Sequence, residues 1–165
     1  MKKVFKIIGI VLLVLIVVAI IMPKGNDTEV KKEDDSTVLA VGKTYSFDKF
    51  DFTLKSLSLV KGSDEKDALK YTYDWKNKDD DAAMPFMTFQ LKGFQDGVEV
   101  DSSYFLDDVN LEKEQKQVKK DGEVTDCEAA VGYIDVSKKV ELELSETFSF
   151  SDKKYTMELD PSTLK

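Results

Sequence analysis

The residues best able to do chemistry in this chain are carboxylates, and the densest run of them lies in the segment "NKDDD". Asp79, Asp80 and Asp81 follow one another there, and Asp107 and Asp108 form a second acidic pair. Calcium takes about six to eight oxygen ligands, which loops at one end of a β-sandwich can supply together. The spacing does not match an EF-hand loop, because the glycine and the closing glutamate are missing. Two interpretations stay open: a calcium site at Asp79, Asp80 and Asp81, or solvated turn residues.

Most other chemistry is excluded by what the composition lacks. The 165 residues include no histidine, and all 24 basic residues are lysine. Without histidine the chain has no usual general base at neutral pH, no Ser-His-Asp or Cys-His arrangement, and no imidazole ligand for a transition metal. Neither a P-loop nor a GxGxxG motif is present. We therefore expect no enzymatic activity, no catalytic residue, and no cofactor apart from the calcium considered above.

The charge distribution limits the class of partner. From Gly25 onward the chain carries 20 lysines and all 32 acidic residues, a net charge of −12. Nucleic acid is a poor partner for such a surface, because its phosphates require clustered cations. Cationic proteins and neutral surfaces fit better. We expect the partner to be a protein or another component of the cell envelope.

An apolar segment near the N-terminus predicts attachment to a membrane. Residues 7–22 are 16 consecutive apolar residues, counting Gly9, and a spanning helix needs about 20. Lys2, Lys3 and Lys6 precede the segment, which by the positive-inside rule keeps the N-terminus in the cytoplasm. We expect a single-pass anchor that holds the rest of the chain outside the cytoplasm.

The sequence predicts three parts of the chain: the apolar N-terminal segment, a linker and one folded domain. Residues 1–23 are expected to form an uncleaved transmembrane helix, and a cleaved signal that releases a secreted protein is the alternative. Lipid attachment requires a cysteine directly after the leader, whereas the single cysteine is Cys127. Residues 24–37 are polar and acidic and predict a flexible linker. Residues 38–165 are long enough for one domain with its own core.

A two-residue hydrophobic period dominates this domain and predicts β-strands. Phe50, Phe52 and Leu54 alternate with polar residues, and the apolar set then changes parity, which indicates a bulge near Lys55. Gln-Asp-Gly at residues 95–97 predicts a turn. The tract 111–120 has too few apolar residues for a packed helix and predicts a solvated loop or an edge strand. The expected strands are 50–54, 69–75, 86–94, 98–100, 127–133, 140–144, 147–150 and 155–159, with turns at 119–122 and 151–154. Seven to nine short strands are typical of an antiparallel β-sandwich.

Four further side chains have a predicted role within that sandwich. Cys127 and Ala129 alternate with Glu128 and Ala130, so Cys127 is expected to be a small buried side chain in a strand. A reactive thiol or an intermolecular bridge is the alternative, because a lone cysteine has no intramolecular partner. Trp75 is expected to anchor the core. Tyr104 and Phe105 lie in the acidic connection "DSSYFLDD", where aromatic residues predict either a partner-binding surface or a cover over the end of the core.

The order of these segments also resembles a known family. "YDWKNKDDDAAMPFMTFQLKGFQDGVEV", then "VKKDGEV", then "AAVGYIDVSKKVELEL" is similar to the uncharacterised immunoglobulin-like domain family of exported and lipoprotein-type proteins in Gram-positive bacteria. The residues that carry the resemblance are Trp75, Asn77, Phe86, Phe89, Gln95 to Gly97, Gly122, Tyr133 and Val140 to Leu144. The resemblance implies an all-β, immunoglobulin-like antiparallel β-sandwich. The N-terminal sequence adds one transmembrane helix and a flexible linker before it. It implies no particular activity.

Together these observations predict a membrane-anchored, extracytoplasmic and non-enzymatic binding module of a bacterial cell envelope. One alternative is an immunity or exclusion protein that captures a cationic toxin or phage component at the cell surface. A calcium-binding surface domain is the other.

Overall fold

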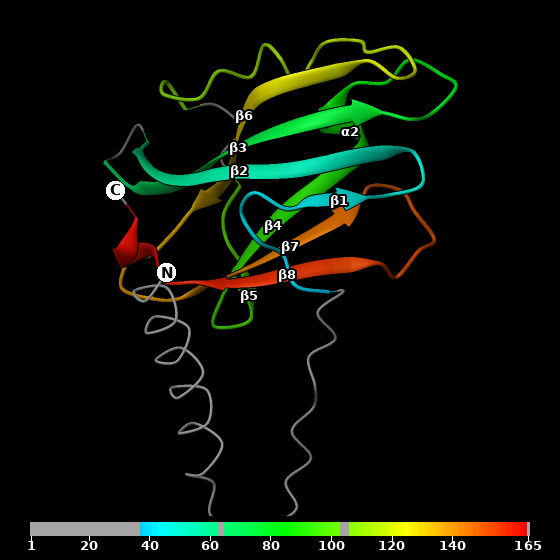
Figure 1. The fold of residues 1–165 in the computed structure, drawn as a ribbon. Helices are drawn as coiled ribbons and strands as arrows, with labels where there is room; N and C mark the ends of the chain where they lie inside the picture. The colour runs from blue at the N-terminus through cyan, green and yellow to red at the C-terminus, as the bar shows by residue number, and fades with distance from the viewer. Residues whose placement is uncertain (1–36, 63–64, 103–105, 165) are drawn as a thin grey trace, which may run out of the picture. The chain divides into compact units, whose positions relative to one another are not determined.

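The computed structural model describes residues 37–62, 65–102 and 106–164, and almost all regular structure in them is β-strand (Figure 1). Strand segments alternate apolar and polar residues, so each can bury one face against a facing sheet. The strands are β1 (Thr44–Ser46), β2 (Phe50–Lys61), β3 (Asp67–Asn77), β4 (Phe89–Gln95), β5 (Val98–Glu99), β6 (Glu123–Tyr133), β7 (Val140–Glu146) and β8 (Lys154–Leu159). The helical segments are α2 (Pro85–Thr88) and the 3-10 turn η1 (Pro161–Thr163).

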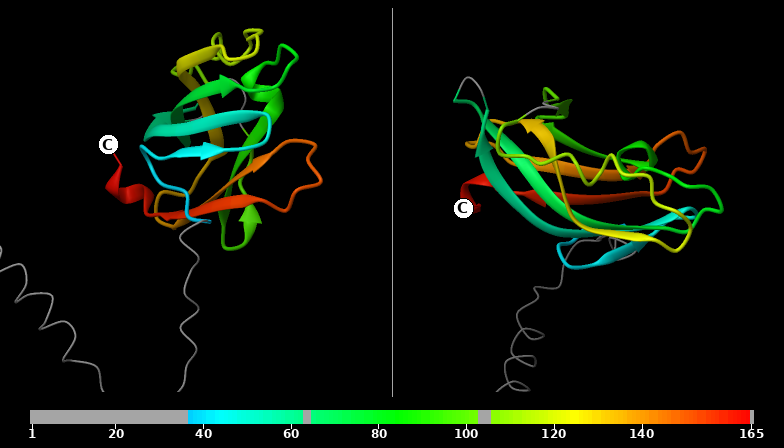
Figure 2. Two further views of the ribbon diagram at one scale, coloured as in Figure 1. Left: turned by 45° about the vertical axis from the view of Figure 1, so that its right-hand side comes forward. Right: turned by 90° about the horizontal axis from the view of Figure 1, so that it is seen from above.

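These strands form two antiparallel sheets that pack face to face. One sheet has the order β1-β2-β3-β6, and the other has the order β5-β4-β7-β8. The chain changes sheet between β3 and β4, between β5 and β6, and again between β6 and β7, as Figure 2 shows from two sides. The structure therefore confirms the expected all-β, two-sheet architecture.

Inward-facing aromatic side chains join the two sheets. Phe89 of β4 reaches across to β2 and β3, with its ring centroid 4.8 Å from that of Phe52 and 5.1 Å from that of Tyr73. Trp75 is 1% exposed and Cys127 is fully buried, so both predicted core positions are confirmed. Offset and edge-on aromatic pairs at these separations stabilise a core beyond simple burial of area.

Two local predictions from the sequence are confirmed in detail. The pairing of β2 with β3 shifts register between Leu54 and Ser56, where the change of parity predicted a bulge. Gln95, Asp96 and Gly97 make the turn between β4 and β5, with positive φ at Asp96 and Gly97. Two successive residues with positive φ match the twist of a two-residue hairpin, and glycine adopts this conformation at little cost.

Two predicted strands are wrong in part or entirely. The strand expected at 86–94 begins only at Phe89, because Pro85 starts the helical turn α2 and its fixed φ suits a first helical position. Thr88 ends that turn, where its hydroxyl donates to the Pro85 carbonyl and accepts from Trp75 Nε1. The strand expected at 147–150 is a turn and loop, because Phe148 adopts a φ of 55° and breaks the extended chain.

The predictions for the N-terminal part concern residues outside those described. The helix expected at 1–23 and the linker expected at 24–36 lie there, and only Thr37 of the linker is described. Within residues 37–62, 65–102 and 106–164, no helix has the length and hydropathy needed to cross a bilayer.

Candidate functional site

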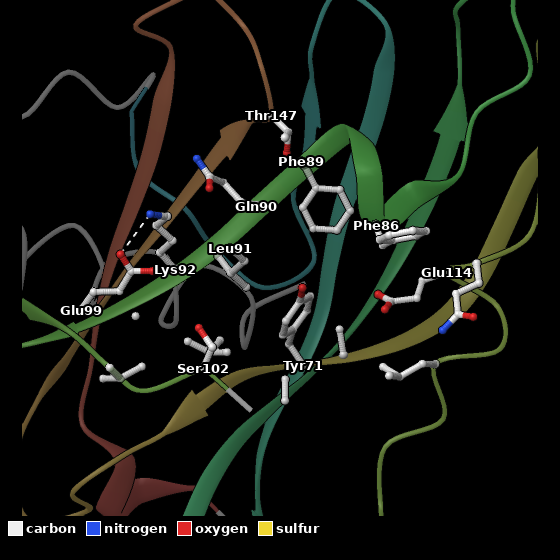
Figure 3. A pocket seen from close by; sticks show the side chains of 17 residues that line it. Tyr71, Phe86, Phe89, Gln90, Leu91, Lys92, Glu99, Ser102, Glu114 and Thr147 are labelled. Atoms are coloured by element: carbon white, nitrogen blue, oxygen red, sulfur yellow. Dashed lines mark hydrogen bonds and ion pairs between the residues drawn. The ribbon is translucent and has the colours of Figure 1, made fainter. Parts of the chain in front are cut away.

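A cavity of about 490 Å³ opens at one side of the sandwich, between β4 of one sheet and β6 of the other (Figure 3). Residues 89–93 of β4 form one wall, and residues 129–131 of β6 form the opposite wall. The segment between β5 and β6 contributes Leu111 and Glu114. The cavity therefore lies where the two sheets are not closed by a shared strand.

The sheet topology explains why this side is open. β5 is only two residues long and pairs with Phe94 and Gln95, so most of β4 has no strand partner on that side. β6 is the last strand of its own sheet. Gly93 lets the sheets approach at one end of the cavity, because a Cβ atom there would lie 2.6 Å from a methyl carbon of Val131.

The walls of the cavity are mainly apolar and aromatic. Tyr71 of β3 rises between β4 and β6, and Phe89 and Leu91 face it from β4 (Figure 3). These three side chains are buried, whereas Phe86 of α2 is 46% exposed at the mouth. Apolar walls with a few polar groups are typical of sites that bind small molecules or side chains.

Glu114 is the polar group with the most unusual environment. Its Oε2 accepts a hydrogen bond from the Tyr73 hydroxyl at 3.2 Å, and its main-chain carbonyl accepts from the N–H of Phe86 at 3.4 Å. Burial raises the pKa of the Glu114 carboxyl to about 7. No ion pair among the described residues includes Glu114. This carboxyl therefore lacks the cation that would compensate its charge.

The hydroxyls of Tyr71 and Tyr73 stay protonated, so the Tyr73 hydroxyl can donate its hydrogen bond to Glu114. Burial raises the pKa of Tyr73 and of Tyr71 far above the ordinary range. At the other end of the cavity, Lys92 Nζ lies 3.0 Å from Glu99 Oε2, so this lysine already has an anionic partner (Figure 3). The two ends of the cavity therefore differ in charge. At one end Lys92 and Glu99 neutralise each other, and at the other end the Glu114 carboxyl has no cationic partner among the described residues.

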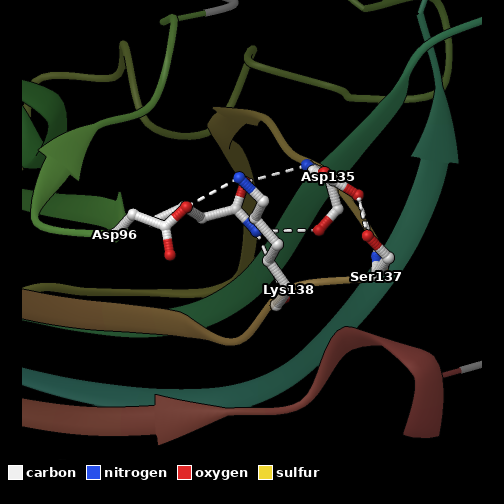
Figure 4. Close-up of polar contacts among 5 residues, drawn as sticks. Asp96, Asp135, Ser137 and Lys138 are labelled. Carbon is white, nitrogen blue, oxygen red and sulfur yellow. Dashed lines mark hydrogen bonds and ion pairs between the residues drawn. The ribbon is translucent and has the colours of Figure 1, made fainter.

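A hydrogen-bond network joins the β4–β5 turn to the turn that follows β6 (Figure 4). Gln95 at the end of β4 accepts from the Asp135 N–H at 2.8 Å and donates to the Asp135 carbonyl at 2.8 Å. Lys138 Nζ lies 2.6 Å from Asp96 Oδ2 in the adjacent turn. Side chains of Gln-Asp-Gly therefore join the β4–β5 turn to the turn between β6 and β7, which gives the motif of residues 95–97 a structural role.

The acidic run lies elsewhere, and its carboxylates face lysines. Asp79 Oδ2 lies 2.9 Å from Lys49 Nζ, which lowers the pKa of Asp79, and Asp80 pairs with Lys120. Asp81 contributes its main-chain carbonyl as an acceptor. In the part of the chain that the structure describes, no group of three acidic or cysteine side chains could hold a metal ion. Both interpretations of Asp79, Asp80 and Asp81, a calcium site and solvated turn residues, stay open, and a calcium titration distinguishes them.

Asn77 organises the turn that carries those acids. Its side-chain amide is fully buried, donates to the carbonyls of Asp81 and Val118 at 2.8 and 2.9 Å, and accepts from the Asp79 N–H. The residue therefore joins the turn after β3 to the turn before β6.

The sequence predicted the strands that contain the walls, but it did not predict that β4 and β6 border a cavity or that Glu114 lies in it. Glu114 is one acid among 32, inside a tract interpreted only as a solvated loop or an edge strand. The tract 111–120 does form turns, but Glu114 points back at Tyr73. The predicted partner-binding residues Tyr104 and Phe105 lie outside the described residues.

Fold and cavity together define the class of this protein: a two-sheet antiparallel β-sandwich with an apolar pocket at its open side. A solved structure described as "a putative lipoprotein from Staphylococcus aureus subsp. aureus NCTC 8325" is similar in fold, with a TM-score of 0.58 and 14% sequence identity over 77% of this chain and 94% of that one. No curated protein matches the chain. A family model described as "Domain of unknown function (DUF5067)" matches residues 25–146. The chain belongs to this family, which confirms the expected resemblance to an uncharacterised family.

Proposed function

We propose that this chain is a non-enzymatic binding module held outside the cytoplasm by its N-terminal segment. The cavity between β4 and β6 is the observation that carries the proposal. Its volume of about 490 Å³ falls in the range of ligand sites, and its walls combine buried aromatic side chains with one uncompensated acid. Tyr71 and Glu114 are the central residues of this site.

The proposed location is supported by the N-terminal sequence. An apolar run of 16 residues preceded by Lys2, Lys3 and Lys6 is typical of a segment that inserts with its N-terminus in the cytoplasm. A single, buried Cys127 leaves the domain without a disulfide, so packing alone stabilises it. The alternative in which the leader is cleaved gives the same site on a secreted protein.

The strand order supports an immunoglobulin-like assignment of the sandwich. The order β2-β3-β6 facing β5-β4-β7-β8 corresponds to strands A-B-E facing C′-C-F-G, with β1 added at the outer edge. Strand D has no counterpart among the described residues. That is the side where the cavity opens, so a binding site there replaces a strand of the standard sandwich.

Site-specific photo-crosslinking in the producing cells tests the binding function. We would incorporate p-benzoyl-phenylalanine in place of Phe86, at the cavity mouth, or in place of Val98, which is 69% exposed and outside the cavity. A saturable adduct at position 86 that is absent at position 98 is the expected result. Equal adducts at both positions, or none at position 86, would contradict the proposal.

Location is tested with a membrane-impermeant maleimide on intact cells. Cys127 is fully buried, so the parent chain supplies an unlabelled background. Asp152 is exposed on the loop before β8, and an Asp152→Cys variant introduces one accessible thiol. Labelling of the variant in intact cells is expected. Labelling only after the cells are lysed would place the domain in the cytoplasm and refute the proposed location.

A further inference from the structure

Strand β4 has an unpaired edge along the cavity. The Gly93 carbonyl accepts from the Val100 N–H at 2.9 Å, so the main-chain groups of Gly93 point away from β7. Main-chain groups of alternate residues in a strand point to the same side, and those of Leu91 therefore point to this edge as well. β5 pairs only with Phe94 and Gln95. Leu91 thus offers one donor and one acceptor that no described residue uses.

The cavity extends along that edge. Inward-facing Leu91 and outward-facing Gln90 and Lys92 all line it, which places the opening over the rim of the strand. A strand added at such an edge would make main-chain hydrogen bonds and direct alternate side chains into the cavity. The edge is therefore suited to an extended chain rather than to a helix.

The end of the cavity near Glu114 is suited to a cation. Its carboxyl has no lysine partner among the described residues and is held by the Tyr73 hydroxyl. Phe86 and Tyr71 flank it with aromatic rings (Figure 3). An ammonium or guanidinium group placed there would gain a charge-assisted hydrogen bond and contact with aromatic faces.

We propose that the cavity binds an extended peptide segment that pairs with the edge of β4 at Leu91 and places a lysine or arginine side chain beside Glu114. The inference rests on the proposed binding function and names the chemistry of the partner. The domain's excess of acidic residues favours approach of such a basic segment.

This binding mode is linked to pH. A bound cation favours the ionised form of Glu114, whereas burial in the free protein favours the protonated form, so affinity rises with pH up to about 8. The other titratable groups near the carboxyl do not ionise in this range: Tyr71 and Tyr73 have raised pKa values, and burial raises the pKa of Cys127 to about 11. We expect up to about thirtyfold tighter binding at pH 8 than at pH 5.5, since pH 5.5 lies about 1.5 units below the Glu114 pKa and each such unit weakens binding up to tenfold.

The lysines closest in sequence are engaged elsewhere. Lys113 Nζ donates to the Thr125 carbonyl at 2.8 Å, and Lys116 Nζ lies 3.0 Å from Glu112. Glu112 therefore provides a matched control: it is an exposed acid two residues from Glu114, outside the cavity, and Glu112→Gln makes the same change of charge on the same loop.

Affinity selection from defined peptide pools tests the inference. The full chain in detergent micelles is incubated with four pools of acetylated pentapeptide amides, whose central residue is lysine, arginine, norleucine or glutamate and whose flanking residues are valine, isoleucine, threonine or serine. Retained peptides are quantified by mass spectrometry at pH 5.5 and pH 8. A fifth pool repeats the lysine set with N-methylated main-chain amides, which cannot pair with a strand.

At pH 8 the lysine and arginine pools are expected to be retained about tenfold more than the norleucine pool, consistent with one charge-assisted contact. Glu114→Gln is expected to abolish this preference, whereas Glu112→Gln retains it, and N-methylation is expected to abolish retention. Equal retention of lysine and norleucine pools, a lysine preference that survives Glu114→Gln, or retention of no pool would overturn the inference. If no pool is retained but crosslinking through position 86 succeeds, only the peptide partner is refuted and the binding function stands.

Discussion

The buried carboxyl of Glu114 predicts an unusual dependence of stability on pH. Its pKa is about 7 in the folded protein, whereas the ordinary value of 4.5 applies to the unfolded chain. Between these values the folded state binds more protons than the unfolded state, so the free energy of unfolding falls as pH rises. Below about pH 4.5 the carboxyl is protonated in both states and does not affect stability. Above about pH 7 the folded state carries the full free-energy cost of burying the ionised carboxylate.

The size of this effect follows from the same two values. A rise in pKa from 4.5 in the unfolded chain to about 7 in the folded protein lowers the free energy of unfolding by about 3 kcal/mol for a fully buried group. Glu114 keeps partial contact with solvent, so we expect about half of that, ~1.5 kcal/mol. Replacing Glu114 with glutamine removes the charge and keeps an acceptor for the Tyr73 hydroxyl. Glu114→Gln should therefore lie within about 0.5 kcal/mol of the parent at pH 5 and exceed its stability by ~1.5 kcal/mol at pH 8.

Urea unfolding of the full chain in micelles, followed by tryptophan fluorescence at pH 5, 6, 7 and 8, measures this difference. Trp75 is the only tryptophan and is buried, so it reports the loss of the core. The chain has no histidine, and the described carboxyls with lowered pKa values titrate below this window. Glu112→Gln serves as the control and should follow the parent. Parallel curves for the parent and Glu114→Gln across the four pH values would refute the reasoning.

Further predictions concern the parts of the domain around this site. Asn77→Ala should lower the free energy of unfolding by about 3 kcal/mol, because two buried carbonyls lose their donor; a urea midpoint within error of the parent would contradict it. The Cys127 thiol, fully buried and with a pKa raised to about 11, should react with a disulfide reagent only in denaturant. Phe148→Ser combined with Phe150→Ser should change stability by less than about 0.5 kcal/mol in the same urea assay, because both rings are exposed. Addition of calcium to ~1 mM should leave Tm within about 1 °C, since carboxylates in residues 79–81 already face lysines; a rise of several degrees would support a calcium site instead.

The sandwich could be predicted because most of its strands keep a two-residue hydrophobic period between bulges. The change of parity after Leu54 located a bulge, and Gln95 to Gly97 located a hairpin turn, since both features are encoded within a few residues. The errors arose where local pattern and three-dimensional context disagree. Phe148 and Phe150 alternate with polar residues as a strand would, yet no facing sheet covers them. Without a facing sheet to pack against, the local preference for a strand is not sufficient to form one.

The candidate site could not be predicted because it results from strand pairings that are absent at one side of the two described sheets. It depends on the shortness of β5 and on β6 being the last strand of its sheet. Neither fact follows from periodicity. Glu114 becomes distinctive only when the chain brings it to Tyr73, which lies 41 residues away in sequence. A carboxyl acquires its raised pKa from burial, which the sequence around it does not report.

The most direct test of the proposed binding site is residue-resolved amide hydrogen exchange by NMR on the full chain, with and without a saturating lysine-centred peptide pool at pH 8. The Leu91 N–H faces the open edge of β4, so it should exchange rapidly in the free protein and at least about tenfold more slowly with peptide bound. The Gln90 N–H points toward β7 and should be protected equally in both states. An unchanged Leu91 amide, whether the pool binds elsewhere or not at all, would contradict the account of β4 as the binding edge.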